Sequence, residues 1–253
     1  MKMTGETPIE VSWMEKLSHP RLPHLDLHDL LELLYKFQCK RIEAISERLG
    51  NLDGGKIYML GKMKNYVVDK SMSIYRAGCF PFVPVLPKGK LFTFYDIMMA
   101  SSSTEDRITP SLNLKWIEDT PEHKSPHEIP YIIFNIYIGD DEKGLSPRNG
   151  LAKIVKNRRT PINMADALAV RFHMDFIKKR PFHVCGSIYR NHLVPGLCNT
   201  QDGTLTCTDP DGLKEGWVCP SYEESMVAFS WHGVTSPKAF LDFLNRRKKT
   251  SGG

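Results

Sequence analysis

The stretch IPYIIFNIYIG, from Ile129 to Gly139, is the most clearly patterned part of the sequence and decides its fold. β-Branched and aromatic residues fill it almost without interruption, which is typical of a β-strand buried on both faces. The polar turn GDDEKG ends it. Ser146 then stands before Pro147, and Asn163 stands before MADALAV, both of which are signals of a helix start. We therefore predict a buried strand followed by two amphipathic helices.

Toward the N-terminus, the segment LDLHDLLELLYKFQCKRIEAISERLG (25–50) predicts the longest helix, with Asp26 as its cap and Gly50 at its end. Its apolar residues return to one face at helical spacing: Leu27, Leu30, Leu31, Leu34, Phe37, Ile42, Ile45 and Leu49. We expect this face to pack against a sheet.

Between that helix and Pro130 the sequence indicates short strands and turns. Strands are expected at KIYML (56–60), CFPFVPVLP (79–87) and LNLKWIE (112–118), with a brief helix near Tyr95–Ala100. The prolines of CFPFVPVLP interrupt backbone hydrogen bonding, so an edge strand is predicted there.

After Pro181 the pattern changes to short strands separated by turn residues, and a final helix is expected from Ser236. The strands are expected at PFHVCGSIY (181–189), LVPGL (193–197), TLTCT (204–208), GWVC (216–219) and MVAFSW (226–231). The predicted fold is α+β, with a mixed or mostly antiparallel sheet, flanking amphipathic helices and a β-rich C-terminal half. We expect one domain over 21–247, an irregular segment at 1–20 and a basic tail at 248–253.

Composition narrows the class of protein. The chain has 253 residues, of which 41% are hydrophobic and 25% charged, with a formal net charge of +5. No apolar run is long enough to span a membrane, and no signal peptide is recognisable, so a cytoplasmic location is expected.

Nucleic acid is not the expected partner, because three basic runs (156–159, 178–180 and 246–249) fall at predicted helix C-termini, where cations complement the helix dipole. The segment GNLDGGK (50–56) has P-loop-like spacing but closes a helix, which excludes a phosphate-binding loop.

Four cysteines, Cys185, Cys198, Cys207 and Cys219, lie in one stretch of the C-terminal half. Zinc sites usually take two ligands from one tight turn, and no such cysteine pair exists here, so we expect no metal and no cofactor. Packing in a β-rich core is the expected role of these thiols.

Groups suited to ligand binding are concentrated in the same half. Aromatic walls with a few polar groups are typical of small-molecule sites. We predict ligand contacts by Arg190, His192, Trp217, Trp231 and His232. The alternative for the tryptophans is a place in the core, which is the commonest use of a large aromatic side chain.

Several segments together resemble a family of uncharacterised bacterial proteins, common in actinobacteria and known only as a domain of unknown function. The similarity extends from His19 to Cys219, and the segments that carry it are HPRLPHLDLHDLLELL, FPFVPVLP, IPYIIFNIYIGDDEKGLSPRNGLAKIVKNRRTPINMADALAV, FHVCGSIYRNHLVPGL and GWVC. Gly186, Ser187, Val194 and Pro195 are among the most specific positions. After Trp217 the sequence departs from the family pattern. The resemblance implies a bacterial cytoplasmic domain and carries no activity.

Two hypotheses of function follow from the sequence. The first is a non-catalytic domain that binds an unknown small molecule or protein partner. The second is an enzyme with a dispersed site, built from Cys185 or Cys219 with His183, His192 or His232. Motif absence does not exclude this enzyme, because catalytic groups are recognised by geometry and not by sequence order.

Overall fold

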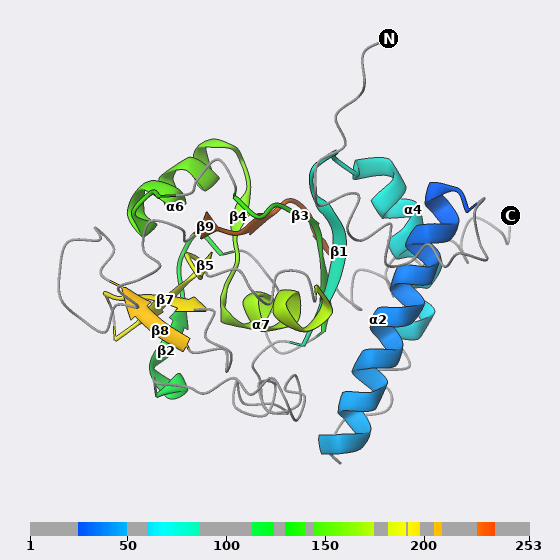
Figure 1. Ribbon diagram of the computed structural model, residues 1–253, viewed down its shortest axis with the longest axis horizontal. Helices are drawn as coiled ribbons and strands as arrows, with labels where there is room; N and C mark the ends of the chain where they lie inside the picture. Colours follow the sequence, from blue (N-terminus) through cyan, green and yellow to red (C-terminus); the bar gives the residue numbers. More distant parts are fainter. Residues whose placement is uncertain are drawn as a thin grey trace, which may run out of the picture. The chain divides into compact units, whose positions relative to one another are not determined.

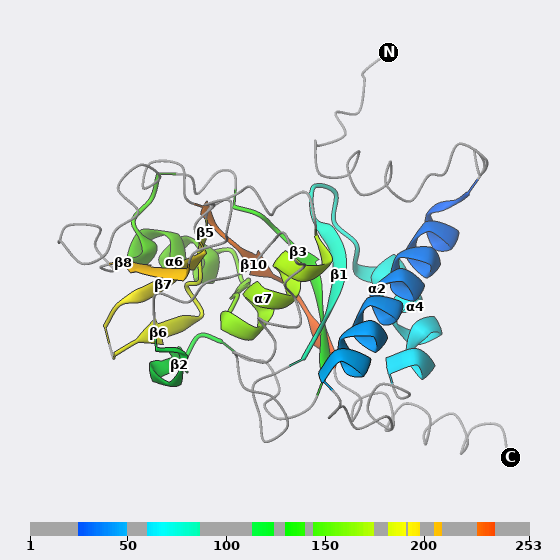
Figure 2. The ribbon, with the colours of Figure 1, turned by 60° about the horizontal axis from the view of Figure 1, so that its bottom comes forward.

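In the computed structural model of the chain, the strand expected at Ile129–Gly139 is present as β3 (Tyr131–Ile136) (Figure 1, and turned in Figure 2). All six of its residues are buried, which confirms the predicted burial on both faces. It lies between β1 (Phe80–Val85) and β11 (Val234–Thr235) in a three-stranded sheet. β11 runs antiparallel to β3. β1 is at the edge of the sheet, as predicted. Its two prolines lack a backbone N–H, and an edge strand tolerates this because only one of its sides is paired.

The structure describes residues 25–49, 60–86, 113–123, 130–139, 144–174, 182–190, 192–197, 205–208 and 227–235. By their contacts these residues fall into two compact units. The first unit takes its residues from 1–91, 126–135 and 233–253, and the second from 92–125 and 136–232. The interpretation of 21–247 as one domain stays a prediction, and the segments 1–20 and 248–253 lie outside the described residues.

In the first unit, α2 (Leu27–Leu49) is the predicted long helix. Asp26 caps it, because its Oδ1 accepts a hydrogen bond from the backbone N–H of Asp29 at 2.9 Å. This cap is confirmed, whereas the predicted end at Gly50 lies outside the described residues. The buried side chains of the helix include Leu31, Leu34, Tyr35, Gln38 and Ile42.

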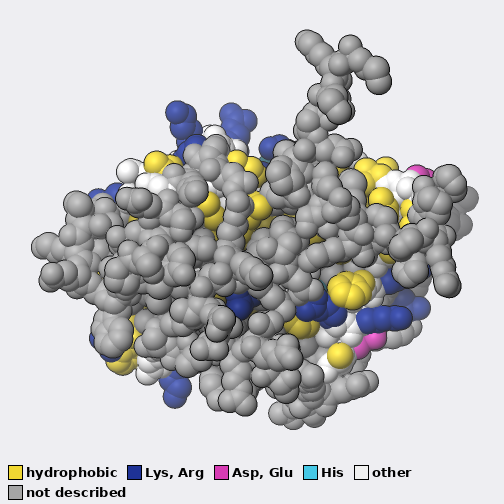
Figure 3. Space-filling model, in the orientation of Figure 1, with side chains coloured by type: hydrophobic (Ala, Val, Ile, Leu, Met, Phe, Trp, Pro, Cys, Tyr) yellow, Lys and Arg dark blue, Asp and Glu magenta, His cyan; other side chains and the backbone are white. Residues whose placement is uncertain are grey.

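One residue of the predicted apolar face of α2 is misplaced. Phe37 is 47% exposed, and the guanidinium of Arg41 lies 5.5 Å from its ring centroid. Gln38 takes the buried position one turn after Leu34 and donates a hydrogen bond to the carbonyl of Phe82 at 3.0 Å. The expectation for Phe37 was wrong because the buried position is occupied by Gln38, a polar residue whose hydrogen bond to a backbone carbonyl permits its burial. Figure 3 shows hydrophobic, basic and acidic side chains exposed together over this helix.

The helix α4 (Lys64–Ile74) was not predicted, and it stands where short strands were expected. Leu60, the last residue of the expected strand KIYML, is also helical. The two helices lie side by side in Figure 1 and Figure 2, and Glu32 of α2 accepts hydrogen bonds from Lys36 and Lys64, both at 2.6 Å. These ammonium groups lower the pKa of Glu32 to about 2.

The second unit holds most of the short strands. Their bounds are β2 (Ile117–Asp119), β4 (Thr160–Pro161), β5 (Phe182–His183), β6 (Ser187–Tyr189), β7 (Val194–Leu197), β8 (Leu205–Thr208), β9 (Val227–Ala228) and β10 (Ser230–Trp231). They form a sheet of order β8-β7-β5-β9 and the pairs β2-β6 and β4-β10. The pair β5–β9 is parallel, and the pairs β5–β7, β7–β8, β2–β6 and β4–β10 are antiparallel. The predicted α+β class with a β-rich C-terminal half is confirmed.

Both predicted helix starts of the second unit are confirmed. α6 (Pro147–Lys156) begins after Ser146, whose Oγ accepts from the backbone of Asn149 at 3.4 Å. α7 (Met164–His173) begins after Asn163, which forms a reciprocal capping box with Asp166. α6 ends in basic residues, as expected from the helix dipole, and Figure 3 shows Lys and Arg side chains over this end.

Several expectations fall outside the described residues: the helix near Tyr95–Ala100, the strand GWVC, the helix from Ser236 and the basic runs 178–180 and 246–249. In the part of the chain that is described, no helix is both long and apolar enough to cross a membrane.

Candidate functional site

Two of the predicted ligand-binding residues, Arg190 and His192, lie together at the tip of the hairpin that joins β6 to β7. The hairpin is closed by Tyr189 and Leu193, whose backbones exchange hydrogen bonds of 2.7 and 3.0 Å. Both Arg190 and His192 are exposed. A tight closure below an exposed tip presents these two side chains to solvent.

The backbone of Arg190 is held in an uncommon conformation. Its φ of +50° lies in the left-handed region, which costs a non-glycine residue roughly 1–2 kcal/mol. Two contacts hold it there. The N–H of Arg190 donates to the carbonyl of Trp116 at 3.3 Å, and Nδ1 of His192 donates to the carbonyl of Arg190 at 2.7 Å. Strained residues fixed in this way are concentrated at functional sites.

The side chain of Arg190 lies on a surface of two aromatic rings. Its guanidinium carbon is 3.9 Å from the ring centroid of Trp116 and 5.4 Å from that of Tyr189. The two rings are themselves 6.1 Å apart and tilted by 46°. Trp116 belongs to the 3-10 turn η1 (Leu114–Trp116), which leads into β2, and the pairing of β2 with β6 sets Ile117 opposite Tyr189. We call Trp116, Tyr189 and Arg190 the Arg190 platform.

Two residues of the platform, Trp116 and Arg190, are exposed to solvent. Trp116 is 45% exposed, although burial is the usual fate of a tryptophan. Within the described residues the guanidinium of Arg190 makes no hydrogen bond or ion pair, and Glu118 on the adjacent strand does not pair with it. An arginine that stacks on a ring and keeps its N–H groups available is suited to recognition.

A second arginine of the same unit, Arg159, also stacks on an aromatic ring but uses its N–H donors within the protein. Arg159 lies 5.3 Å from the ring centroid of Tyr137, but its Nε donates to Ser230 Oγ at 2.7 Å and its terminal nitrogen donates to the Ser230 carbonyl at 3.2 Å. Arg159 therefore has a structural role, because its donors are used within the protein.

Trp231, also predicted as a ligand contact, lies in the core instead of on the surface. It is 2% exposed, and its indole N–H donates to Asp166 Oδ2 at 2.9 Å. The same oxygen accepts the backbone N–H of Asn163 at 3.2 Å and lies 3.3 Å from Nε2 of His123. The ring of His123 stands edge-on to Trp231, 6.0 Å away. This buried polar cluster holds β10 to the start of α7.

The remaining predicted contacts are His232, Trp231 and Trp217. His232 is half-buried and donates from Nδ1 to the carbonyl of Arg158 at 3.3 Å. Trp217 lies outside the described residues. Among the residues that are described, no hydrogen bond or ring contact joins Trp231 to Arg190 or His192.

The cysteine and histidine of β5 and the turn after it are buried. Cys185 is 3% exposed, packs with Ile154, Val194 and Ala228, and donates from Sγ to the carbonyl of Pro147 at 3.7 Å. Among the residues that the structure describes, Nδ1 of His183 has no hydrogen-bond partner, and burial lowers the pKa of this ring to about 4. Within the described residues no hydrogen bond joins these two side chains, so they form no thiolate–imidazole pair.

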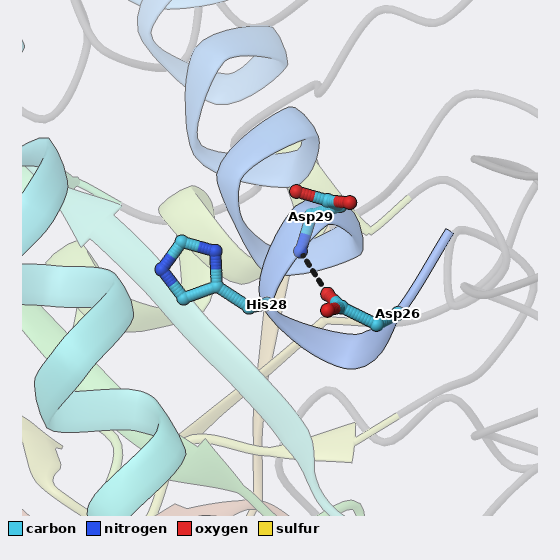
Figure 4. Close-up of side chains that lie close together, drawn as sticks. All are labelled: Asp26, His28 and Asp29. Atoms are coloured by element: carbon cyan, nitrogen blue, oxygen red, sulfur yellow. Dashed lines mark hydrogen bonds between the residues drawn. The ribbon is translucent and has the colours of Figure 1, made fainter. Parts of the chain in front are cut away.

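One group of potential metal ligands comes together within the described residues. Ligand atoms of Asp26, His28 and Asp29, all exposed, lie within 4.8 Å of one another at the start of α2. Figure 4 shows that Asp26 is engaged with the backbone of Asp29. Acidic residues stabilise the N-terminus of a helix through its dipole, so capping accounts for the carboxylates of this cluster.

The chain matches no protein-family model, no curated protein and no solved structure. The resemblance to the actinobacterial family therefore stays a prediction.

Sequence reasoning missed the main partner of Arg190. Trp116 was read as part of a strand, and its exposure depends on the pairing of β2 with β6, which no local pattern reveals. Asp166 was missed as well, although Asn163 and Asp166 have the spacing of a capping box, which would have pointed to it.

Proposed function

We propose that this chain is a non-catalytic binding protein whose recognition surface is the Arg190 platform. The observation that carries the proposal is the stacking of an exposed arginine on an exposed tryptophan, with the arginine's N–H groups available. Exposed tryptophan, tyrosine and arginine side chains are the residues that most often contribute the energy of binding sites. An exposed stack of this kind is worth only about 0.5–1 kcal/mol to the fold, so stability alone gives weak reason for it.

An enzyme is the less supported function. It would need a cysteine or serine next to a histidine in a place that substrate can reach. Cys185 lies among aliphatic side chains and donates to a backbone carbonyl, whereas His183 is buried and its Nδ1 has no partner among the described residues. Cys219 lies outside the described residues. No described contact favours the enzyme.

We also propose kinship with the actinobacterial family and a cytoplasmic location. The kinship is supported by the segments between His19 and Cys219. Gly186, one of its most specific positions, also has a steric reason to be glycine: an added Cβ would lie 2.4 Å from the carbonyl oxygen of Ile162.

The proposal is tested by thermal-shift screening of a metabolite panel, because a ligand that binds only the folded state raises its apparent stability. Hits are repeated with Trp116→Ala and with Val155→Ala, which removes another exposed hydrophobic side chain of the same unit, 49% exposed on α6. We expect hits whose shift is lost in Trp116→Ala and kept in Val155→Ala. A panel without hits, or hits that survive Trp116→Ala, would contradict the proposal.

A further inference from the structure

We infer that the ligand of the Arg190 platform is an aromatic anion, in which a carboxylate or phosphate group is attached to a flat ring. The inference rests on the proposed function and adds the chemical class of the ligand. Its two parts come from the two exposed residues of the platform, the guanidinium of Arg190 and the side chain of Trp116.

The anionic part follows from the stacking geometry. The guanidinium carbon of Arg190 lies 3.9 Å from the ring centroid of Trp116, and within the described residues no hydrogen bond or ion pair uses the five N–H donors that lie in the plane of the group. Such a planar edge binds carboxylate or phosphate through two parallel hydrogen bonds. Lys115, exposed beside Trp116 in the chain, adds positive charge to the same turn.

Preorganisation separates Arg190 from an ordinary surface arginine. Its backbone is fixed by the Trp116 carbonyl and by His192, and its side chain rests on two rings. A side chain that is ordered before binding loses less conformational entropy when the ligand arrives.

Arg158 provides the matched comparison in the same unit. It is exposed, has a φ of +55°, and its carbonyl accepts a hydrogen bond from His232, just as the Arg190 carbonyl accepts one from His192. Within the described residues Arg158 stacks on no ring. The two arginines thus share charge, exposure and backbone geometry, and they differ in the platform.

The ring part follows from Trp116. With 45% of the residue exposed while Arg190 stacks on it, apolar indole surface stays in contact with water beside a cation. A ring attached to the anion covers this surface, and offset stacking of two rings adds to the area that is buried. An anion without a ring would leave the indole exposed.

The experiment is an NMR titration that follows the indole N–H signal of Trp116, assigned by Trp116→Phe. The probes are phenyl phosphate and phenylacetate as aromatic anions, benzyl alcohol as a neutral ring, and inorganic phosphate and acetate as anions without a ring. Each titration is repeated with Arg190→Ala and Arg158→Ala, after circular dichroism has shown that both variants are folded.

We expect phenyl phosphate or phenylacetate to shift the Trp116 signal, and the stronger of the two identifies the anion. Arg190→Ala should weaken this binding at least about tenfold, the usual scale for hydrogen bonds to a charged group, and Arg158→Ala should leave it unchanged. Equal binding of benzyl alcohol, or unchanged binding by Arg190→Ala, would overturn the anionic part while the proposed function stands. Equal binding of acetate or inorganic phosphate would overturn the ring. A Trp116 signal that no probe moves would overturn the inference as a whole, whereas the proposed function is tested separately by the metabolite panel.

Discussion

Acidification from pH 7.5 to 4.5 should destabilise this protein through His183 of β5. The ring is buried, its Nδ1 has no hydrogen-bond partner in the described part of the chain, and burial lowers its pKa from an ordinary 6.5 to about 4. Below pH 6.5 the unfolded chain binds a proton at this position, whereas the folded protein binds it only near pH 4. Stability is therefore complete above pH 6.5 and falls as the pH decreases toward 4. At about 1.36 kcal/mol for each tenfold difference in proton affinity, the full effect is about 3 kcal/mol, and roughly 2–3 kcal/mol of it is lost by pH 4.5.

The assay is urea denaturation of the wild type, His183→Leu and His183→Gln at both pH values. Other groups also titrate in this range, so the decisive quantity is the difference between wild type and variant in the free energy lost on acidification. Both variants should lose about 2–3 kcal/mol less than the wild type, whatever their stability at pH 7.5. The leucine and glutamine variants differ in polarity, so a packing defect in one of them would not be mistaken for the effect of removing the ionisable ring. Equal losses in all three proteins would refute the buried, neutral state of His183.

Three further predictions concern stability and are measured by urea denaturation at pH 7.5. Gly186→Ala should cost about 3 kcal/mol, the upper end of the usual cost of overpacking, because the added Cβ would lie 2.4 Å from a backbone carbonyl oxygen. Gly61→Ala, with nothing within 4 Å of its Cβ, should be neutral or stabilising, and similar values for the two variants would contradict the close approach at Gly186. Trp231→Phe should cost about 1–3 kcal/mol, because it removes the indole N–H that donates to the buried carboxylate of Asp166. An unchanged stability would show that this hydrogen bond does not stabilise the fold. Arg158→Gly and Arg190→Gly both relieve a left-handed backbone, but among the described contacts only Arg190→Gly loses a cation–π stack, so it should be about 0.5–1 kcal/mol less favourable. Equal effects of the two substitutions on stability would contradict the stack.

The parts of the fold that the sequence predicted are those set by neighbouring residues. The caps at Asp26, Ser146 and Asn163 act over three residues, and the uninterrupted apolar run of β3 indicates burial without knowledge of its neighbours. The helix α4 was missed because its sequence, KNYVVDKSMSI, places β-branched residues side by side and has little helical periodicity. The helix packs against α2, and tertiary contacts of this kind commonly override local preference.

In the candidate site, too, the residues that are close in the chain were predicted, and those brought in by tertiary contacts were not. Arg190 and His192 were predicted, and a tight hairpin brings them together because they are close in the chain. Trp116 reaches them only through the register of β2 against β6, which the sequence does not specify. Trp231 was predicted as a ligand contact, but Asp166 accepts its N–H inside the protein. Composition can indicate which side chains suit a ligand, whereas exposure depends on long-range packing.

The central claim, that the guanidinium of Arg190 binds the ligand, is tested most directly by observing that group itself. The Nε–H signals of Arg190 and Arg158 can be assigned with the two alanine variants and followed by nitrogen–proton NMR as phenyl phosphate is added. We expect the Arg190 signal to move with the same saturation curve as the Trp116 indole signal, while the Arg158 signal stays in place. Equal movement of both arginine signals, or a stationary Arg190 signal, would contradict it.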